Sequence, residues 1–371
     1  TTKIPQTLLQ QNSLEDLTPS HQSSARLKEK PEHFTVLLRS SRNPAEFPFL
    51  DPRPILNVHM LAFSTCWNNS RHTDGEEMID EILELGFDTL ELSHGMTVAK
   101  LPGIKRAFAA NKFKCIGVHN YFPSPTEVMI DAPDAFEFSS NNKNERDKAF
   151  RETLKTLEMA HEFGAYYVVL HMGSVTTMPH KKWTGALTKK LAAGEQLTGE
   201  YADDKIECVK RREKHGPKYF DRAIDTLERL IEPAKKAGVK LAIESRSRYE
   251  DVPDEVEMIQ LQDYFKDCPQ IGYWHDFGHV GLKHNLGLLD HDQWLGKMAP
   301  HLIGAHLHDV RWPKRDHRVP FTGELPYDDL LKHFKPEMPF TWELSPSCKT
   351  EHILPAAKLW RQKYRETQEL P

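Results

Sequence analysis

The segment WHDFGHV, residues 274 to 280, places one carboxylate and two histidines within five residues, directly after the apolar Ile271 and Tyr273. Carboxylate oxygens and imidazole nitrogens are ligands for divalent metals such as Mn, Mg, Co or Zn. The same kinds of side chain close other short apolar runs along the chain: His119, His171, Glu244, the pair His306 and His308, and Glu343. One such residue would mean little, but six consecutive runs that end this way indicate a shared metal site.

Glu244 and Glu343 are the strongest candidate ligands, and Asp276 is placed in a similar way. Each closes an apolar run, where a buried carboxylate without a partner costs several kcal/mol. A cation is therefore required, and a metal is favoured over a salt bridge from Arg246 or Arg248. A single histidine at such a place is more often a hydrogen-bonded cap than a ligand.

These residues meet only if the elements that carry them share one edge. Short β-rich runs alternate with stretches of helical spacing eight times, which predicts eight parallel strands closed into a (β/α)8 TIM barrel. An open doubly wound sheet is the alternative, but no G-x-G-x-x-G follows the first run. The runs span 55–64, 88–93, 114–120, 166–172, 239–245, 271–276, 302–309 and 339–345; helices are expected over 74–86, 97–111, 145–164, 217–238, 254–267, 291–299, 326–335 and 350–367.

The period of a strand predicts which side chains face the barrel. Alternation puts Trp274 and Asp276 on one face and turns His275 outward, toward the helices. The same rule cannot separate His306 from His308, because they are two residues apart. In a barrel of this kind, catalytic groups lie at the carboxyl ends of the strands.

Three segments are expected. Residues 1–54 are polar and proline-bearing and form an N-terminal extension, and residues 55–371 form the catalytic barrel. Between the fourth strand and its helix, residues 172–214 exceed the usual two to six residues of such a connection, so a lid-like β4-α4 insertion is predicted. Its charges are mixed, which favours a solvated lid over a DNA-binding surface.

Composition limits the partners. The net charge is -5 and the pI about 6.5, so nucleic acid is not an expected partner. The five cysteines show no C-x-x-C spacing, and reduced, buried thiols are expected. No apolar run is long enough to span a membrane. We expect a cytoplasmic protein, although a chain that does not begin with methionine can have lost a leader. The sequence leaves the oligomeric state open, and a homo-oligomer is one of the expected forms.

The motifs LAIESR, GYWHDFGH, IGAHLHDV and FTWELSP, in this order and spacing, resemble the xylose-isomerase-like TIM barrel superfamily of sugar isomerases and epimerases, which also contains the apurinic endonuclease family. The resemblance covers about residues 55 to 365. It implies one divalent metal ion as cofactor, held by Glu244, Asp276, His306 and Glu343. The substrate-binding residues expected beside it are His119, His171, Arg246, His279, His308 and Asp316.

The resemblance implies a small-molecule carbohydrate substrate and an isomerase or epimerase, or a keto-sugar lyase. A metal-stabilised enediolate would form, with Glu244 and Glu343 as acid and base from the two sides of the mouth. One alternative is a metal-dependent phosphodiester hydrolase of the apurinic endonuclease type, for which His119 and His171 stand at matching places and which would hold about three metals. The other is a sugar-binding barrel without turnover.

Overall fold

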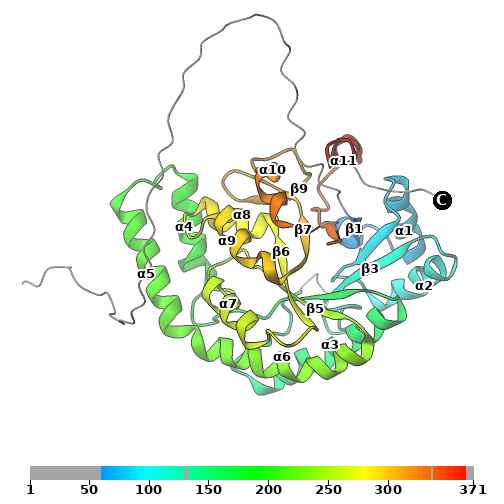
Figure 1. Ribbon diagram of the computed structural model, residues 1–371, viewed down its shortest axis with the longest axis horizontal. Coiled ribbons are helices and arrows are strands. Elements are labelled where there is room, and N and C mark those ends of the chain that lie inside the picture. Colours follow the sequence, from blue (N-terminus) through cyan, green and yellow to red (C-terminus); the bar gives the residue numbers. More distant parts are fainter. Residues whose placement is uncertain (1–59, 129–132, 336, 365–371) are drawn as a thin grey trace, which may run out of the picture. The chain divides into compact units, whose positions relative to one another are not determined.

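The computed structural model describes residues 60–128, 133–335 and 337–364, and the predicted extension, residues 1–54, lies outside this part of the chain. Eight parallel strands close into a barrel in the order β1-β10-β7-β6-β5-β4-β3-β2 (Figure 1). The predicted (β/α)8 TIM barrel is therefore confirmed. The strands are β1 (Leu61–Ser64), β2 (Thr89–Leu92), β3 (Lys114–His119), β4 (Tyr167–Leu170), β5 (Lys240–Glu244), β6 (Ile271–Asp276), β7 (Leu302–Leu307) and β10 (Phe340–Trp342).

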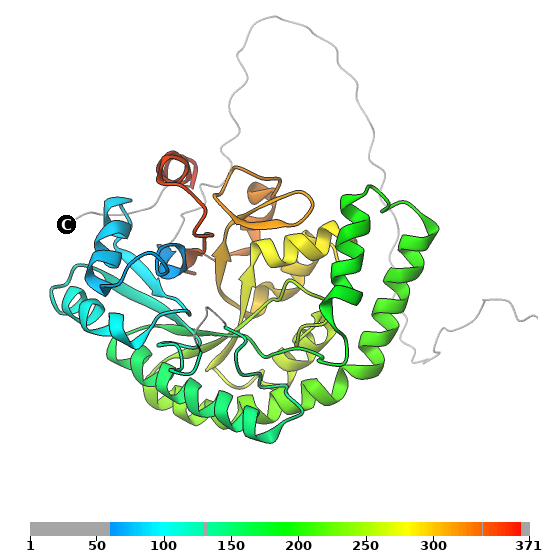
Figure 2. The ribbon, with the colours of Figure 1, turned by 180° about the vertical axis from the view of Figure 1, so that it is seen from behind.

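Helices surround these strands in both views (Figures 1 and 2). Local sequence fixes several of their ends: the Asp74 side chain caps α1 by accepting from the Glu76 N–H at 2.7 Å, and Gly238, with a φ of 75°, ends α6. The helices are α1 (Gly75–Glu84), α2 (Leu101–Ala109), α3 (Lys143–Glu162), α4 (Thr184–Ala192), α5 (Gly199–His215), α6 (Pro217–Ala237), α7 (Glu255–Tyr264), α8 (Phe277–Asn285), α9 (His291–Met298), α10 (Tyr327–Leu330) and α11 (Thr350–Tyr364). None of these described helices has the length and apolar character needed to cross a membrane.

Three helices were not predicted. The insertion over 172–214 contains α4 and α5, which stand together beside α8 (Figures 1 and 2). Tyr201, Cys208 and Arg212 recur at helical spacing and form the buried face of α5, a signal that the mixed charges obscured. The third helix, α8, begins directly after β6. The lid role of the insertion stays a prediction.

Other differences are smaller. The helix predicted over 326–335 is only the single turn α10 followed by a 3-10 turn, Leu331–His333. An antiparallel hairpin of β8 (Asp309–Arg311) and β9 (Arg315–Arg318) follows β7. The five cysteines form no disulfide; four are buried and Cys268 is half-buried.

Two large aromatic side chains fill the inside of the barrel. Tyr167 and Trp274 are fully buried and lie with ring centroids 4.1 Å apart. Each faces a glycine on the neighbouring strand, because Gly117 pairs with Tyr167 and Gly304 with Trp274. A Cβ added at Gly117 would lie 2.1 Å from the Tyr167 ring, and one at Gly304 would lie 2.3 Å from the Trp274 ring. The glycines therefore make room for the aromatic core beneath the mouth.

We predict that Gly117→Ala lowers the free energy of unfolding by about 1–3 kcal/mol, because the added methyl overpacks the barrel. Gly199→Ala is the matched control: a Cβ there meets nothing within 4 Å, and the residue begins a helix. Urea unfolding monitored by circular dichroism measures both. Equal midpoints for the two variants would contradict this account of the interior.

Candidate metal and active site

Four buried side chains converge at the carboxyl ends of four adjacent strands. Glu244 ends β5, Asp276 ends β6, His306 lies near the end of β7, and Glu343 directly follows β10. One ligand atom of each lies within 4.8 Å of the others. The sheet register brings Asp276 opposite His306. The residues that the sequence singled out as metal ligands are thus brought together.

His306 is the centre of this cluster. Its Nδ1 lies 2.7 Å from Oε1 of Glu244, 3.3 Å from Oε2 of Glu343 and 3.7 Å from Oδ2 of Asp276. Its other nitrogen, Nε2, lies 3.0 Å from Oε2 of Glu91, and the Tyr167 hydroxyl donates to the same oxygen at 2.8 Å. A carboxylate that holds the proton on Nε2 leaves the lone pair of Nδ1 for a cation. Glu91 therefore fixes the orientation of the His306 ring.

The charges of the cluster compensate one another. Burial opposes protonation of His306, but Glu343, Glu91 and Glu244 raise its pKa well above the ordinary value. Burial likewise opposes ionisation of Glu244, but His171 and His306 hold its pKa well below the usual range. Three buried carboxylates need positive charge, and a divalent cation would supply it in the same place. The residues present fit such an ion.

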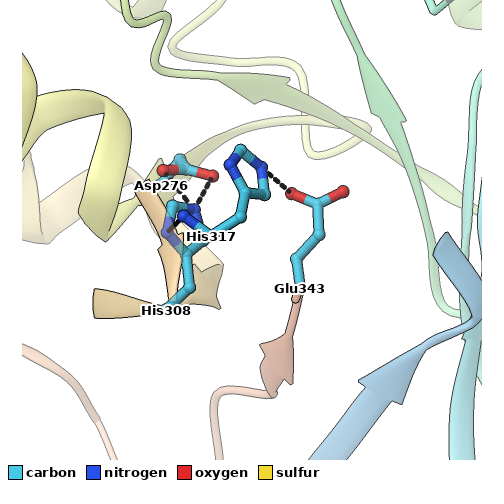
Figure 3. Close-up of side chains that lie close together, drawn as sticks. All are labelled: Asp276, His308, His317 and Glu343. Carbon is cyan, nitrogen blue, oxygen red and sulfur yellow. Dashed lines mark hydrogen bonds and ion pairs between the residues drawn. The ribbon is translucent and has the colours of Figure 1, made fainter. Parts of the chain in front are cut away.

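His308 and His317 support the cluster from the side of the hairpin (Figure 3). The backbone N–H of His317 donates to Nδ1 of His308 at 2.8 Å, so the proton of His308 is on Nε2, which lies 3.0 Å from Oδ1 of Asp276. His308 thus positions Asp276. Nε2 of His317 lies 3.4 Å from Oε2 of Glu343, and the two imidazoles stack with centroids 4.1 Å apart.

A second group of candidate ligands shares Glu244. Nε2 of His171 lies 2.5 Å from Oε2 of Glu244, and Nε2 of His119 lies 3.8 Å from the same oxygen. Arg246 contacts His171 and lies 3.6 Å from Glu244, whereas Arg248, the other arginine considered from the sequence, forms no ion pair with it. Asp134 accepts from Arg246 at 3.0 Å and lies 2.8 Å from Nδ1 of His171.

A third group contains His279, Asp316 and His317. Nδ1 of His279 lies 3.0 Å from the carbonyl oxygen of Ser245, so it donates there and Nε2 keeps its lone pair. Burial lowers the pKa of His279, which agrees with a neutral ring. The Asp276 side chain also accepts from the His279 N–H at 2.6 Å and so caps α8. His275 points away, toward α9, with its Nε2 3.0 Å from Nε2 of His291, as the alternation predicted.

All the candidate site residues therefore lie at one mouth. Sequence reasoning missed four neighbours: Glu91, His94, Asp134 and His317. The alternation of DTLELS places Glu91 on the inner face of its strand, and His94 follows the end of that strand, so both carried the signal used elsewhere. Asp134 and His317 lie on connections, where no period predicts position.

Comparison with known proteins settles the family. A family model described as "Xylose isomerase-like TIM barrel" matches residues 79–367. The chain belongs to this family. No curated protein matches the chain.

Solved structures of similar fold are consistent with this family. A D-tagatose 3-epimerase-like protein is 16% identical, with 82% of this chain and 96% of that chain covered and a TM-score of 0.56. A 3-keto-D-glucoside 4-epimerase from E. coli is 13% identical (82% and 99% covered, TM-score 0.55). A D-allulose 3-epimerase from Methylomonas sp. is 11% identical (83% and 98% covered, TM-score 0.57). At these identities the likeness shows the fold alone.

We predict that His306→Ala lowers the affinity for Mn or Zn by more than about tenfold. Replacement of a residue that only supports a metal ligand typically costs at least this much. His301→Ala is the control, since His301 precedes β7 at the opposite end of the barrel. Metal per chain after dialysis, measured by mass spectrometry beside far-ultraviolet circular dichroism, tests this. Equal metal content in both folded variants would rule out the site.

A separate prediction concerns Glu137, in the connection between β3 and α3. One of its oxygens accepts from the Ser174 hydroxyl at 2.7 Å, and the other is buried with no hydrogen-bond partner among the described residues. Burial raises the pKa of Glu137 from 4.5 to about 7. The folded state thus keeps a proton that the unfolded state releases, so stability falls as pH rises from about 4.5 to about 7.

Glu137→Gln should therefore raise the free energy of unfolding at pH 8 by roughly 1–3 kcal/mol and leave it nearly unchanged at pH 4.5. Denaturant unfolding at both pH values measures the difference. A gain of the same size at both would show that ionisation of Glu137 is not its cause.

Proposed function

We propose that the protein is a divalent-metal-dependent sugar isomerase or epimerase, or a lyase acting on a keto-sugar. The observation that carries the proposal is the arrangement of Glu244 and Glu343, two ionised carboxylates from different strands that both approach Nδ1 of His306. Membership of the Xylose isomerase-like TIM barrel family and the epimerase names of the similar structures support it. When bound, the metal would polarise a carbonyl and an adjacent hydroxyl, which acidifies the C–H between them.

The two glutamates would move the proton. Each turns one oxygen to the centre of the cluster and the other to a second histidine: Oε2 of Glu244 lies 2.5 Å from His171, and Oε1 of Glu343 lies 4.0 Å from His94. One carboxylate takes the proton from carbon and the other, on the opposite side, returns one. The flanking histidines can exchange these protons with the rest of the site.

The remaining side chains would hold and enclose the substrate. His279 offers an unprotonated Nε2 to a sugar hydroxyl, and Arg246 offers its guanidinium beside Glu244. Asp134, on the connection after β3, ties Arg246 to His171 and so keeps the donors in fixed positions. Fixed donors add to the rate because they need no reorganisation as charge develops.

One observation favours a second function, phosphodiester hydrolysis. Five overlapping groups of candidate ligands lie at this mouth, among them the His306 cluster, the His119–His171–Glu244 group and the His279–Asp316–His317 group. Three occupied groups would suit a phosphate ester, whose transition state spreads negative charge over several oxygens. The number of metals bound per chain separates this function from the isomerase, which needs one.

Glu244→Gln and Glu343→Gln should each lower turnover of a ketose by at least about a hundredfold, the usual contribution of a positioned acid or base. Part of the metal should stay bound, since an amide oxygen still coordinates. Glu158→Gln on the exposed face of α3 is the matched control. Turnover in D2O should place deuterium on the carbon between carbonyl and hydroxyl.

Two results would replace this proposal with the hydrolase. They are turnover without deuterium in product or recovered substrate, and cleavage of a phosphodiester that survives Glu343→Gln.

A further inference from the structure

A cavity of about 560 Å³ lies in the helical layer, between α8, α9, α10 and the β8–β9 hairpin (Figure 1). Part of its wall is apolar, formed by Val310, Leu325 and Leu330. The charged side chains of its lining are four carboxylates and one amine: Asp290, Asp292, Glu324, Asp329 and Lys332. The cavity shares no residue with the ligand groups at the mouth of the barrel, so it is a separate space.

The lining has an excess of negative charge that the protein does not compensate. Asp292 is compensated, because Lys332 lies 3.0 Å and His333 lies 2.7 Å from its Oδ1. Among the described residues, the other three carboxylates form no ion pair: Asp290, Glu324 and Asp329. Backbone N–H groups donate to one oxygen of Asp290 and one of Glu324, at 2.9 and 2.8 Å, which leaves the negative charge in place. A ligand of this cavity therefore carries positive charge.

The carboxylates are too widely spaced for a metal ion. Within the part of the chain that the structure describes, groups of three metal-ligating atoms within 4.8 Å of one another occur only at the mouth, and none lines this cavity. Even a large ion such as Ca²⁺ needs several oxygens at about 2.3–2.6 Å. A negative charge spread over a wider space suits an organic cation, whose carbon atoms would pack against Leu325 and Leu330.

His291 brings a polar group to the same cavity. Its side chain lines the space although the residue is only 4% exposed. Its Nε2 lies 3.0 Å from Nε2 of His275, whereas its Nδ1 has no hydrogen-bond partner among the described residues. The two nitrogens of an imidazole point in diverging directions, so Nδ1 points away from His275. Protein atoms do not close this nitrogen off, and the space that it meets is the cavity.

Neighbouring hydrogen bonds place a proton on Nδ1 of His291. Burial lowers the pKa of both imidazoles, that of His291 to about 3, so both rings are neutral. The Trp294 N–H donates to the Tyr273 hydroxyl at 2.9 Å, and this hydroxyl donates in turn to Nδ1 of His275 at 2.9 Å. His275 therefore carries its proton on Nε2 and donates it to Nε2 of His291. The proton of His291 is then on Nδ1, which offers a donor to the cavity.

We propose that this cavity binds a small amine that carries hydroxyl groups, such as an amino sugar. Its ammonium would be held by the field of the three uncompensated carboxylates, and one of its oxygens would accept from Nδ1 of His291. A sugar without an amine would leave the carboxylates uncompensated, and an amine without oxygen would leave the His291 donor without an acceptor. This site is independent of the proposed function, because no residue of the metal cluster takes part in it.

Calorimetry with D-glucosamine tests the assignment. The full-length protein is titrated as the wild type, as the double variant Glu324→Gln/Asp329→Asn and as the control Asp267→Asn. Asp267 is exposed, precedes β6 and lies outside the cavity lining. The double variant should bind D-glucosamine at least about tenfold more weakly, and the control should match the wild type. Both substitutions of the double variant keep the size of the side chain, and thermal unfolding verifies that all three proteins are folded.

Two further ligands separate the charge from the hydroxyl groups. N-acetyl-D-glucosamine keeps the hydroxyls without the positive charge, and cyclohexylamine keeps the charge without hydroxyls. Each should bind the wild type at least about tenfold more weakly than D-glucosamine. Equal affinity of either ligand would overturn the proposed class of ligand, and absence of D-glucosamine binding to the wild type would overturn the site.

A variant of the metal cluster separates the cavity from the mouth of the barrel. Glu343→Gln should bind D-glucosamine as the wild type does, whether or not the proposed isomerase or epimerase activity is found. Loss of binding in this variant would place the amine at the mouth and overturn the assignment. Equal affinity in the cavity double variant and in Asp267→Asn would overturn it as well.

Discussion

Burial of three carboxylates at the mouth of the barrel is the constraint on which the rest of this structure depends. Glu244, Asp276 and Glu343 are almost inaccessible to water, so each needs opposite charge or hydrogen-bond donors close by. The protein surrounds them with histidines on strands and connections, and His306 sits between all three. Histidine suits this position because it can carry a proton when no cation is present and release it when one binds.

The aromatic interior provides the base of the site. Trp274 packs edge-on against His306 with centroids 5.2 Å apart, and Tyr167 reaches Glu91 from below. These contacts hold the His306 imidazole in place from its buried side. They also keep out water, which could otherwise replace a hydrogen bond of the ring. The same two rings depend on the glycines opposite them, so the packing of the barrel interior also determines the orientation of the His306 ring.

Much of the site was predictable from the sequence, because parallel strands place their ends at one edge. That rule alone located Glu244, Asp276 and Glu343, and strand alternation separated His275 from Asp276. His317 could not be found this way, since it reaches Glu343 from a hairpin whose path depends on contacts remote in sequence. Helix α5 was missed although its buried residues recur at helical spacing, because one of them is Arg212, whose charge is compensated by Glu257 of the remote α7. The contact of Glu91 with His306 could not be predicted, because it depends on which side chains meet across the barrel interior.

Helix α8 gives the molecule a fixed internal length. Its first turn is held by the Asp276 side chain, and beyond its last turn the Tyr201 hydroxyl donates to the Leu286 carbonyl at 2.9 Å. With a rise of about 1.5 Å per residue, Leu282 and Leu286 lie roughly 9 and 15 Å along the axis from Asp276. Helix α8 is therefore held at both ends, by the carboxylate cluster at its start and by α5 of the insertion at its end. The mouth of the barrel and the insertion thus share one rigid element, and the position of α5 is tied to that of the Asp276 carboxylate.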